Sequence, residues 1–437
     1  MKNKSILFSF LFLMAASLLS CKKYLDVEPY DSVSDENTIF DQASAETAVR
    51  GAYRSLASNS YGSAFQTTVL LSGGDIRSLN NAQTDLNTIN YDLRSDIGFL
   101  STFWSNGYNT INRANHVIEK VPLITDARLT QALKDQLVGE AYFIRALSYF
   151  DLGRLFGNAQ IFLTPTKTVA DKLGVSQSAQ SRIYEQAIAD LNQAALLLPN
   201  EIVRNRARKL TAVALRARVY LYQKKYAEAE ADASTVLSNP NYKLIKPFAL
   251  AAGTSESVLE LSFSVDAVNA GFGLWNTSNR ALEPKAALHS LLNDSTIGGR
   301  RKILSVANAS GQFIGGIFPT NTAANYILRT AELYLIRAEA RAQKSAPDLI
   351  GAVEDLNAVR FRSAVPLTTA FAKEDILQGI ENERRVEFAL EPFRWFDLVR
   401  TGRAAAVLGA TNPEKYIFPI PASEILADPS LDQNPGY

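Results

Sequence analysis

The chain contains little of the chemistry on which metal centres, disulfides and nucleophilic catalysis depend. Its 437 residues include one cysteine, two histidines and two methionines. A single cysteine cannot close an intramolecular disulfide, and His116 and His289 lie in helical segments without a cysteine or acidic cluster at metal-ligand spacing. The sequence patterns of hydrolase nucleophile elbows, P-loops and dinucleotide-binding turns are also missing. We therefore predict no metal, no cofactor and no catalytic residues.

Charge of either sign is also not in excess. The 45 Lys and Arg residues nearly balance the 44 Asp and Glu residues, the net charge is +1, and there is no long basic run. A nucleic-acid partner is therefore not expected, because a phosphate backbone is bound by clustered positive charge. Hydrophobic residues make up 47% of the chain, which excludes a disordered protein and predicts a globular one with an ample core.

The amino-terminal segment has the features of a secretory signal. Lys2 and Lys4 precede an apolar run from Ile6 to Leu19, which is too short to span a bilayer comfortably. Ser20 then stands before Cys21, as in a bacterial lipoprotein cleavage site. The alternative is an ordinary signal peptide followed by an incidental cysteine. We predict a lipoprotein signal peptide at 1–20, lipidation of Cys21 and a lipidated tether at 21–42, with no later run of about 18 apolar residues that could span a membrane.

Most of the remaining chain has the periodicity of amphipathic helices. Apolar residues recur at helical spacing in 43–58, 99–121 and 129–156, and Gly157 closes the third segment. Further on, small residues recur at helical spacing in several segments that end at a proline, for example Pro199 and Pro240. Small residues let two antiparallel helices approach closely, which is typical of tetratricopeptide repeats. The pattern predicts a mainly α fold, a tetratricopeptide-like superhelix, with helix pairs at about 43–58, 99–238 and 329–400.

Two regions interrupt this pattern. Residues 59–98 and 239–328 are rich in Asn, Ser, Thr and Gly, with scattered aromatic residues. They predict loops, short helices such as 284–292 and a strand at 258–263, laid over the helical scaffold as a loop-rich, irregular half. Long irregular insertions in a compact domain are either disordered or functional, and the aromatic content favours function.

Several blocks in a fixed order resemble one known family, the SusD-like (RagB-like) nutrient-uptake lipoproteins of the outer membrane. They are Ser20 to Pro29, Trp104 with Tyr108, Ile111 and Asn115, Gly139 to Ala146, Leu152 to Gly157, Glu383 to Phe388, Arg394 to Leu398, Phe418 to Pro421 and Gln433 to Tyr437. The resemblance covers the whole mature chain and implies one SusD-like domain at 43–437.

The resemblance also implies a function. Members of this family bind glycans or oligosaccharides and act as a hinged lid on a SusC-like TonB-dependent outer-membrane transporter, without catalysis. It further implies that the chain is lipid-anchored to the outer membrane and exposed at the cell surface. Two alternatives stay open: a tetratricopeptide lipoprotein scaffold that binds a protein or peptide, and a glycosidase whose two carboxylates converge in space.

Candidate ligand contacts come from the two irregular regions, because sugar recognition needs flat apolar surfaces and planar polar side chains. The candidates are Trp275, Phe272, Asn276, Asp75, Arg77, Asn80 and Tyr61. Core packing is the alternative for Trp275, and an Asx turn with a local ion pair is the alternative for Asp75 and Arg77.

The segment 381–403 gathers acidic, basic and aromatic residues and could form an anion site. Because opposite charges recur there at i+3 and i+4 spacing, a salt-bridged helix with buried aromatic residues is favoured.

Overall fold

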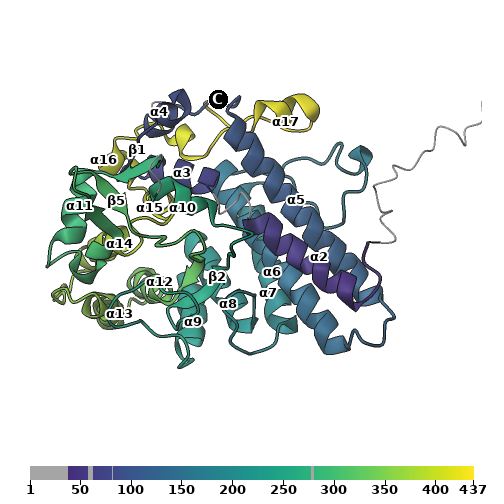
Figure 1. Ribbon diagram of the computed structural model, residues 1–437, viewed down its shortest axis with the longest axis horizontal. Helices are drawn as coiled ribbons and strands as arrows, with labels where there is room; N and C mark the ends of the chain where they lie inside the picture. Colours follow the sequence, from purple (N-terminus) through teal and green to yellow (C-terminus); the bar gives the residue numbers. More distant parts are fainter. Residues whose placement is uncertain (1–37, 58–62, 81, 277–279) are drawn as a thin grey trace, which may run out of the picture.

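The fold is a stack of packed helices that carries an irregular half with short strands (Figure 1). The computed structural model describes residues 38–57, 63–80, 82–276 and 280–437. The main helices are α2 (Gln42–Ser55), α5 (Gly98–Lys120), α6 (Gln131–Phe156), α7 (Gln180–Leu197), α8 (Lys209–Tyr222), α9 (Tyr226–Leu237), α12 (Thr330–Gln343), α13 (Leu349–Arg362) and α14 (Lys373–Glu387). These agree closely with the predicted helical segments, so the mainly α fold class is confirmed.

Neighbouring helices of the stack pack on one another in order, from α5 through α6, α7, α8, α9, α12 and α13 to α14. Their contacts use the small residues that the sequence spacing singled out. Gly139 and Gly153 of α6 lie against Leu198 and Tyr184, so closely that a Cβ atom at either glycine would collide with these side chains. The alanines at the helix contacts are fully buried, among them Ala187, Ala194, Ala217, Ala229, Ala338 and Ala352. The helices can therefore approach closely because the residues at their contacts are glycine and alanine, which have little or no side chain. The tetratricopeptide-like superhelical twist stays a prediction.

The irregular half consists of short elements. Its strands form three antiparallel pairs, β1 (Ile76–Ser78) with β3 (Leu282–Pro284), β2 (Ser257–Leu261) with β6 (Asn325–Arg329) and β4 (Ser305–Ala307) with β5 (Phe313–Gly315). The strand predicted at 258–263 is β2, and the predicted short helix is α11 (Ala286–Asn293). The other short helices are α3 (Ser63–Ser72), α4 (Gln83–Ile89), α10 (Ala270–Trp275), α15 (Arg394–Arg400), α16 (Ala404–Leu408) and α17 (Ala422–Ala427), with 3-10 turns η4 (Val121–Leu123), η5 (Val169–Asp171), η6 (Gly299–Leu304) and η7 (Pro413–Tyr416).

None of the helices in the described part of the chain is both long enough and apolar enough to cross a bilayer. The predicted signal peptide and Cys21 lie outside the described residues, and α2 begins at the end of the predicted tether.

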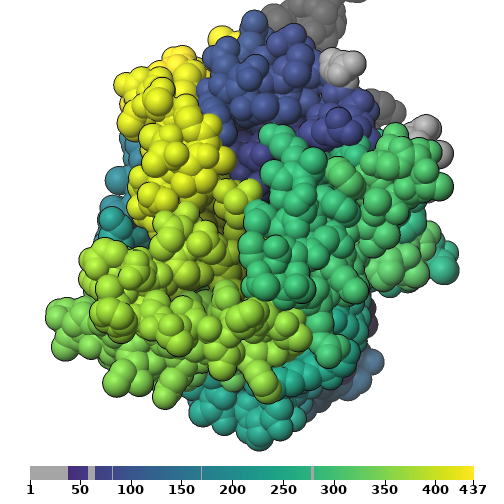
Figure 2. Space-filling model, turned by 90° about the vertical axis from the view of Figure 1, so that its left-hand side faces the viewer, coloured from purple at the N-terminus to yellow at the C-terminus, as the bar shows by residue number. Residues whose placement is uncertain are grey.

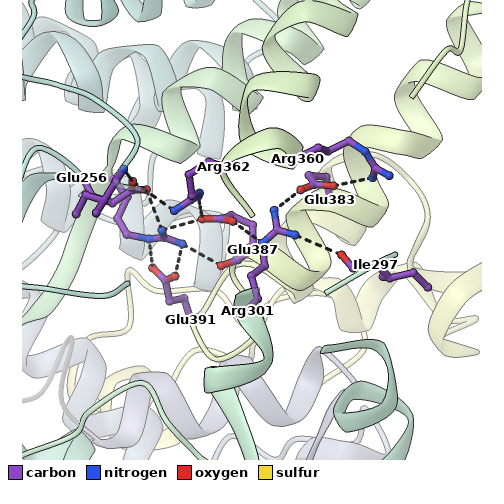
Figure 3. A network of polar contacts seen from close by, with 10 residues as sticks. Glu256, Ile297, Arg301, Arg360, Arg362, Glu383, Glu387 and Glu391 are labelled. Carbon is purple, nitrogen blue, oxygen red and sulfur yellow. Dashed lines mark hydrogen bonds and ion pairs between the residues drawn. The ribbon is translucent and has the colours of Figure 1, made fainter. Parts of the chain in front are cut away.

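A buried network of charges joins the irregular half to the helical stack (Figure 3). The carboxylate of Glu387, at the end of α14, is fully buried and contacts three guanidinium groups. Its Oε1 lies 2.5 Å from Nη2 of Arg362 and 2.9 Å from Nη1 of Arg329, and its Oε2 lies 2.7 Å from Nε of Arg301. Glu256, Glu383, Glu391 and Arg360 extend the network. One side chain thus connects α13, α14, β6 and η6.

Because the network is buried, its ion pairs affect the charge state of Glu387 and the stability of the fold. Desolvation by itself would raise the pKa of Glu387, but the three arginines outweigh it and lower the pKa from an ordinary 4.5 to about 2. The carboxylate is therefore charged in the folded protein, and removing it would leave the four arginines of the network with three carboxylates, so that one buried positive charge is no longer balanced.

We predict that Glu387→Gln lowers the free energy of unfolding by about 3–5 kcal/mol, the usual cost of removing one partner from a buried ion pair. Chemical denaturation followed by circular dichroism measures the difference. Glu185→Gln is the matched control, since Glu185 pairs with Arg182 at 2.5 Å on the surface. Equal stability of the two variants would contradict a structural role for the network.

The same variant should change how stability depends on pH. A folded-state pKa below the unfolded value gives stabilisation that is complete above about pH 4.5 and is lost as the pH falls towards about 2. The neighbouring Glu391, whose pKa is raised by burial, acts in the opposite direction but is present in both proteins. We expect the free energy of unfolding of the wild type to fall more steeply with acidification than that of Glu387→Gln.

Candidate ligand-binding face

Pairing of β1 with β3 brings the two irregular insertions together. Ile76 lies opposite Pro284 in the antiparallel ladder, and the backbone N–H of Leu79 donates to the carbonyl of Ala281 at 2.8 Å. At the other end, the N–H of Lys285 donates to the carbonyl of Asp75 at 2.9 Å. Figure 2 shows the insertions adjoining on one side of the molecule, the first in purple and blue and the second in green. The candidates predicted from separate regions are thus close in space.

Arg77 and Glu283 are direct cross-strand partners on this ladder. Nη2 of Arg77 donates to Oε2 of Glu283 at 2.8 Å, and the backbone N–H of Phe313 in β5 donates to Oε1 at 2.8 Å. Glu283 is buried, whereas 55% of the Arg77 side chain is exposed. The buried carboxylate therefore links three segments and holds an exposed guanidinium group by one of its terminal nitrogens.

The short helix α10 supplies an aromatic ring and an amide. Asn269 caps its first turn by accepting from the N–H of Gly271 at 2.8 Å. Phe272 is half-buried, and Nδ2 of Asn276 donates to the carbonyl of Phe318 at 2.6 Å. Because that bond uses one amide donor, the remaining groups of the half-exposed Asn276 can face a ligand.

Asn80 is an exposed residue beyond the end of β1. The hydroxyl of Ser78 bonds both to its carbonyl at 2.9 Å and to its N–H at 3.1 Å, which fixes the backbone of the turn. The Asn80 side chain thus joins Arg77 as an outward polar group at the β1 end of this face, and Tyr61 lies outside the described residues.

Trp275 belongs to the core, so stacking of its ring on a sugar does not fit this structure. The residue is 0% exposed and packs with Leu274, Leu282 and Phe318 in the core of the irregular half. Its ring lies so close to Gly315 that a Cβ atom there would come within 2.4 Å of it. The sequence left both core packing and ligand stacking open for Trp275, because six residues are too few for helical periodicity to show which face of α10 is buried.

Asp75 also faces inward, and neither an Asx turn nor a pair with Arg77 accounts for it. Its carboxylate accepts from Nη2 and Nε of Arg385 at 2.5 and 2.9 Å, and Nε of Arg394 lies 3.0 Å from it. These partners stand more than 300 residues further along the chain, so local sequence could not identify them.

In the segment 381–403, the charges are paired and the aromatic residues are buried, but the predicted pairing along one helix is wrong for most of them. Among the described residues, Arg400 with Asp397 is the i,i+3 ion pair within the segment, and most other charges pair with distant residues such as Asp75, Arg301 and Glu339. Asp397 contacts Arg384 at 2.8 Å and Arg400 at 2.9 Å. Trp395 is buried and stacks on Tyr91 with ring centroids 5.4 Å apart. Sequence reasoning missed Glu283 and Phe313, because no local signal predicts the strand pairing that joins them.

The face that results is polar and open, with a guanidinium, amides and a half-buried ring. Planar donors of this kind suit pairs of hydroxyl groups, and an aromatic ring suits the apolar surface of a sugar. Within the described residues, no group of three His, Cys, Asp or Glu side chains could hold a metal ion.

Comparison with known proteins agrees with this architecture. A family model described as "Starch-binding associating with outer membrane" matches residues 23–221, and a second, described as the SusD family, matches residues 315–414. SusD-like protein P2 of Formosa agariphila is 25% identical, with all of both chains covered, and SusD-like protein P38 of the same organism is 24% identical with the same coverage.

Solved structures show the same fold. A laminarin-binding SusD-like protein superposes with a TM-score of 0.78 at 24% identity, covering 91% of this chain and 100% of that one. A SusD superfamily protein from Bacteroides vulgatus gives a TM-score of 0.80 at 20% identity, covering 90% and 99%. With both family models matching in chain order and full-length relatives on the same fold, the chain belongs to the SusD/RagB-like family.

Proposed function

We propose that the chain is a glycan-binding subunit that captures oligosaccharides at the outer membrane without cleaving them. The observation that carries the proposal is the exposed guanidinium of Arg77, fixed on the buried Glu283 where the two insertions meet. A guanidinium already held by one terminal nitrogen loses less freedom when its other N–H groups bind hydroxyls, which favours affinity. The laminarin-binding relative and the starch-binding family description support this ligand class.

Binding without hydrolysis is supported by the way Glu283, the buried carboxylate of this face, is used. Glycoside hydrolysis needs two carboxyl groups on either side of the scissile bond. Glu283 is buried and accepts from Arg77 and from the backbone of Phe313, so it is a structural anchor.

We further propose that the protein is anchored through Cys21 and delivers its ligand to a SusC-like TonB-dependent transporter as a lid subunit. The basic start, the apolar run and the Ser20-Cys21 pair support the anchor. The family resemblance supports the transporter as partner.

Arg77→Ala should weaken glycan binding by about tenfold, because a hydrogen-bonding charged group is worth about 1.5–3 kcal/mol. Calorimetric titration with laminarin and a panel of neutral oligosaccharides measures the affinity. Arg182→Ala is the matched control, since this arginine is exposed elsewhere on the surface. If no oligosaccharide bound the wild type while a peptide did, the chain would instead be a peptide-binding scaffold.

Trp275→Ala should affect stability and not only binding. Removing a fully buried tryptophan costs about 3–5 kcal/mol, so the midpoint of thermal unfolding should fall well below that of Arg77→Ala. Differential scanning fluorimetry of both variants makes the comparison. A Trp275→Ala protein that unfolds like the wild type but no longer binds glycan would restore Trp275 as a ligand contact.

Cys21→Ser should release the protein from membranes and abolish labelling by radioactive palmitate. Wild-type protein purified from outer membranes should bring a TonB-dependent barrel with it. Continued labelling of Cys21→Ser would refute the anchor, and repeated purification without a barrel would refute the partner.

A further inference from the structure

A cavity of about 350 Å³ lies apart from the ligand-binding face, between α12, α14 and α15. Its lining includes Arg385, Arg394 and Arg403 together with Gln378, but neither Arg77 nor any residue of α10. Most of the charged groups around it are neutralised in pairs. Arg400, for example, uses all three guanidinium nitrogens, on Asp397 and Glu339, at 2.5–3.0 Å.

Arg385 and Arg394 differ from the other arginines of the cavity because they share one carboxylate. Both approach Asp75, which forms no ion pair with a third residue among those described. Two guanidinium groups beside one carboxylate leave a positive charge uncompensated at this wall. Glu381 is paired with Arg403 at 3.0 Å, and Glu374 is exposed.

The two arginines also keep unused donors. Arg394 makes its contacts through Nε alone, with the Gly73 carbonyl 3.1 Å and Asp75 3.0 Å away. Arg385 uses Nε and Nη2. Within the described residues, Nη1 and Nη2 of Arg394 and Nη1 of Arg385 therefore have no hydrogen-bond partner, and 15% and 27% of the respective side chains are exposed.

Electrostatics at this wall favours a further negative charge. Burial lowers the pKa of Arg394, and repulsion from Arg385 adds to that effect against the attraction of Asp75, Glu381 and Asp397. A second anion would relieve both effects. Guanidinium groups bind carboxylate and sulfate oxygens through parallel N–H donors, so these are the matching chemical groups.

We propose that this cavity is a binding site for the carboxylate or sulfate group of a small anionic ligand, held by Arg385 and Arg394. Asp75 acts as the positioning residue that orients both guanidinium groups. The site goes beyond the proposed glycan-binding function, since its ligand contacts are Arg385 and Arg394, whereas the glycan-binding proposal rests on Arg77. An acidic saccharide and a free inorganic anion share this chemistry.

The test is titration of the full-length mature protein with sodium sulfate, with glucuronate and with glucose as the neutral counterpart, at low chloride. Wild type should bind one or both anions but not glucose at this site. Arg394→Gln should weaken anion binding by about tenfold, the effect of one charge-assisted hydrogen bond. Arg385→Gln should weaken it similarly, whereas Arg182→Gln, at an exposed arginine on another helix, should leave it unchanged.

The unchanged affinity expected for Arg182→Gln separates loss of a ligand contact from a general loss of positive charge. If Arg394→Gln and Arg385→Gln only lowered the unfolding temperature and left anion affinity unchanged, or if the wild type bound neither anion, the proposal would be wrong. Arg77→Ala should keep anion binding, so a failed glycan site and a failed anion site give different results. Glucuronate binding without sulfate binding would identify an acidic sugar as the source.

Discussion

The attraction between Glu387 and three buried arginines determines how the two halves of this protein fit together. The helical stack can be assembled from local periodicity and small residues, but the irregular half has little regular structure of its own. Arg329 ends β6, Arg301 lies in η6 and Arg362 ends α13, so a single carboxylate orients three segments at once. Buried ion pairs are costly to desolvate, and their value here is a defined geometry more than net stability.

The charged groups of this protein fall into two kinds. Around Glu387, guanidinium groups lie in the interior and meet several carboxylates, which makes the arrangement rigid. Asp75 and Glu283 are different: each is a buried carboxylate that pairs with arginines whose side chains are partly exposed, so that some guanidinium nitrogens remain available. Arginine–carboxylate pairs therefore hold segments together where the arginine is buried. Where the arginine is partly exposed, they can present donors to a ligand.

Sequence predicted the helices well and the irregular half poorly, for a physical reason. Helical periodicity and small-residue spacing are local properties, and they placed α2, α5 and α6 within a few residues of their ends. The burial of Trp275 and the partners of Asp75 depend on contacts across tens to hundreds of residues. Arg77 was recognised as a candidate from its loop, but its partner Glu283 was not, since no local pattern links positions 206 residues apart.

The pairing of β1 with β3 has a consequence for how the protein matures. Bringing together strands so distant in sequence closes a very long loop, an entropic cost that three-residue strands cannot offset by themselves. The intervening helices, α5 to α9, pack on their own neighbours along the chain, and this local packing brings the two strands closer together. Ligand recognition consequently requires both strands. A fragment ending before residue 282 would contain Arg77 but would lack β3 and its Glu283, which holds the Arg77 side chain in place.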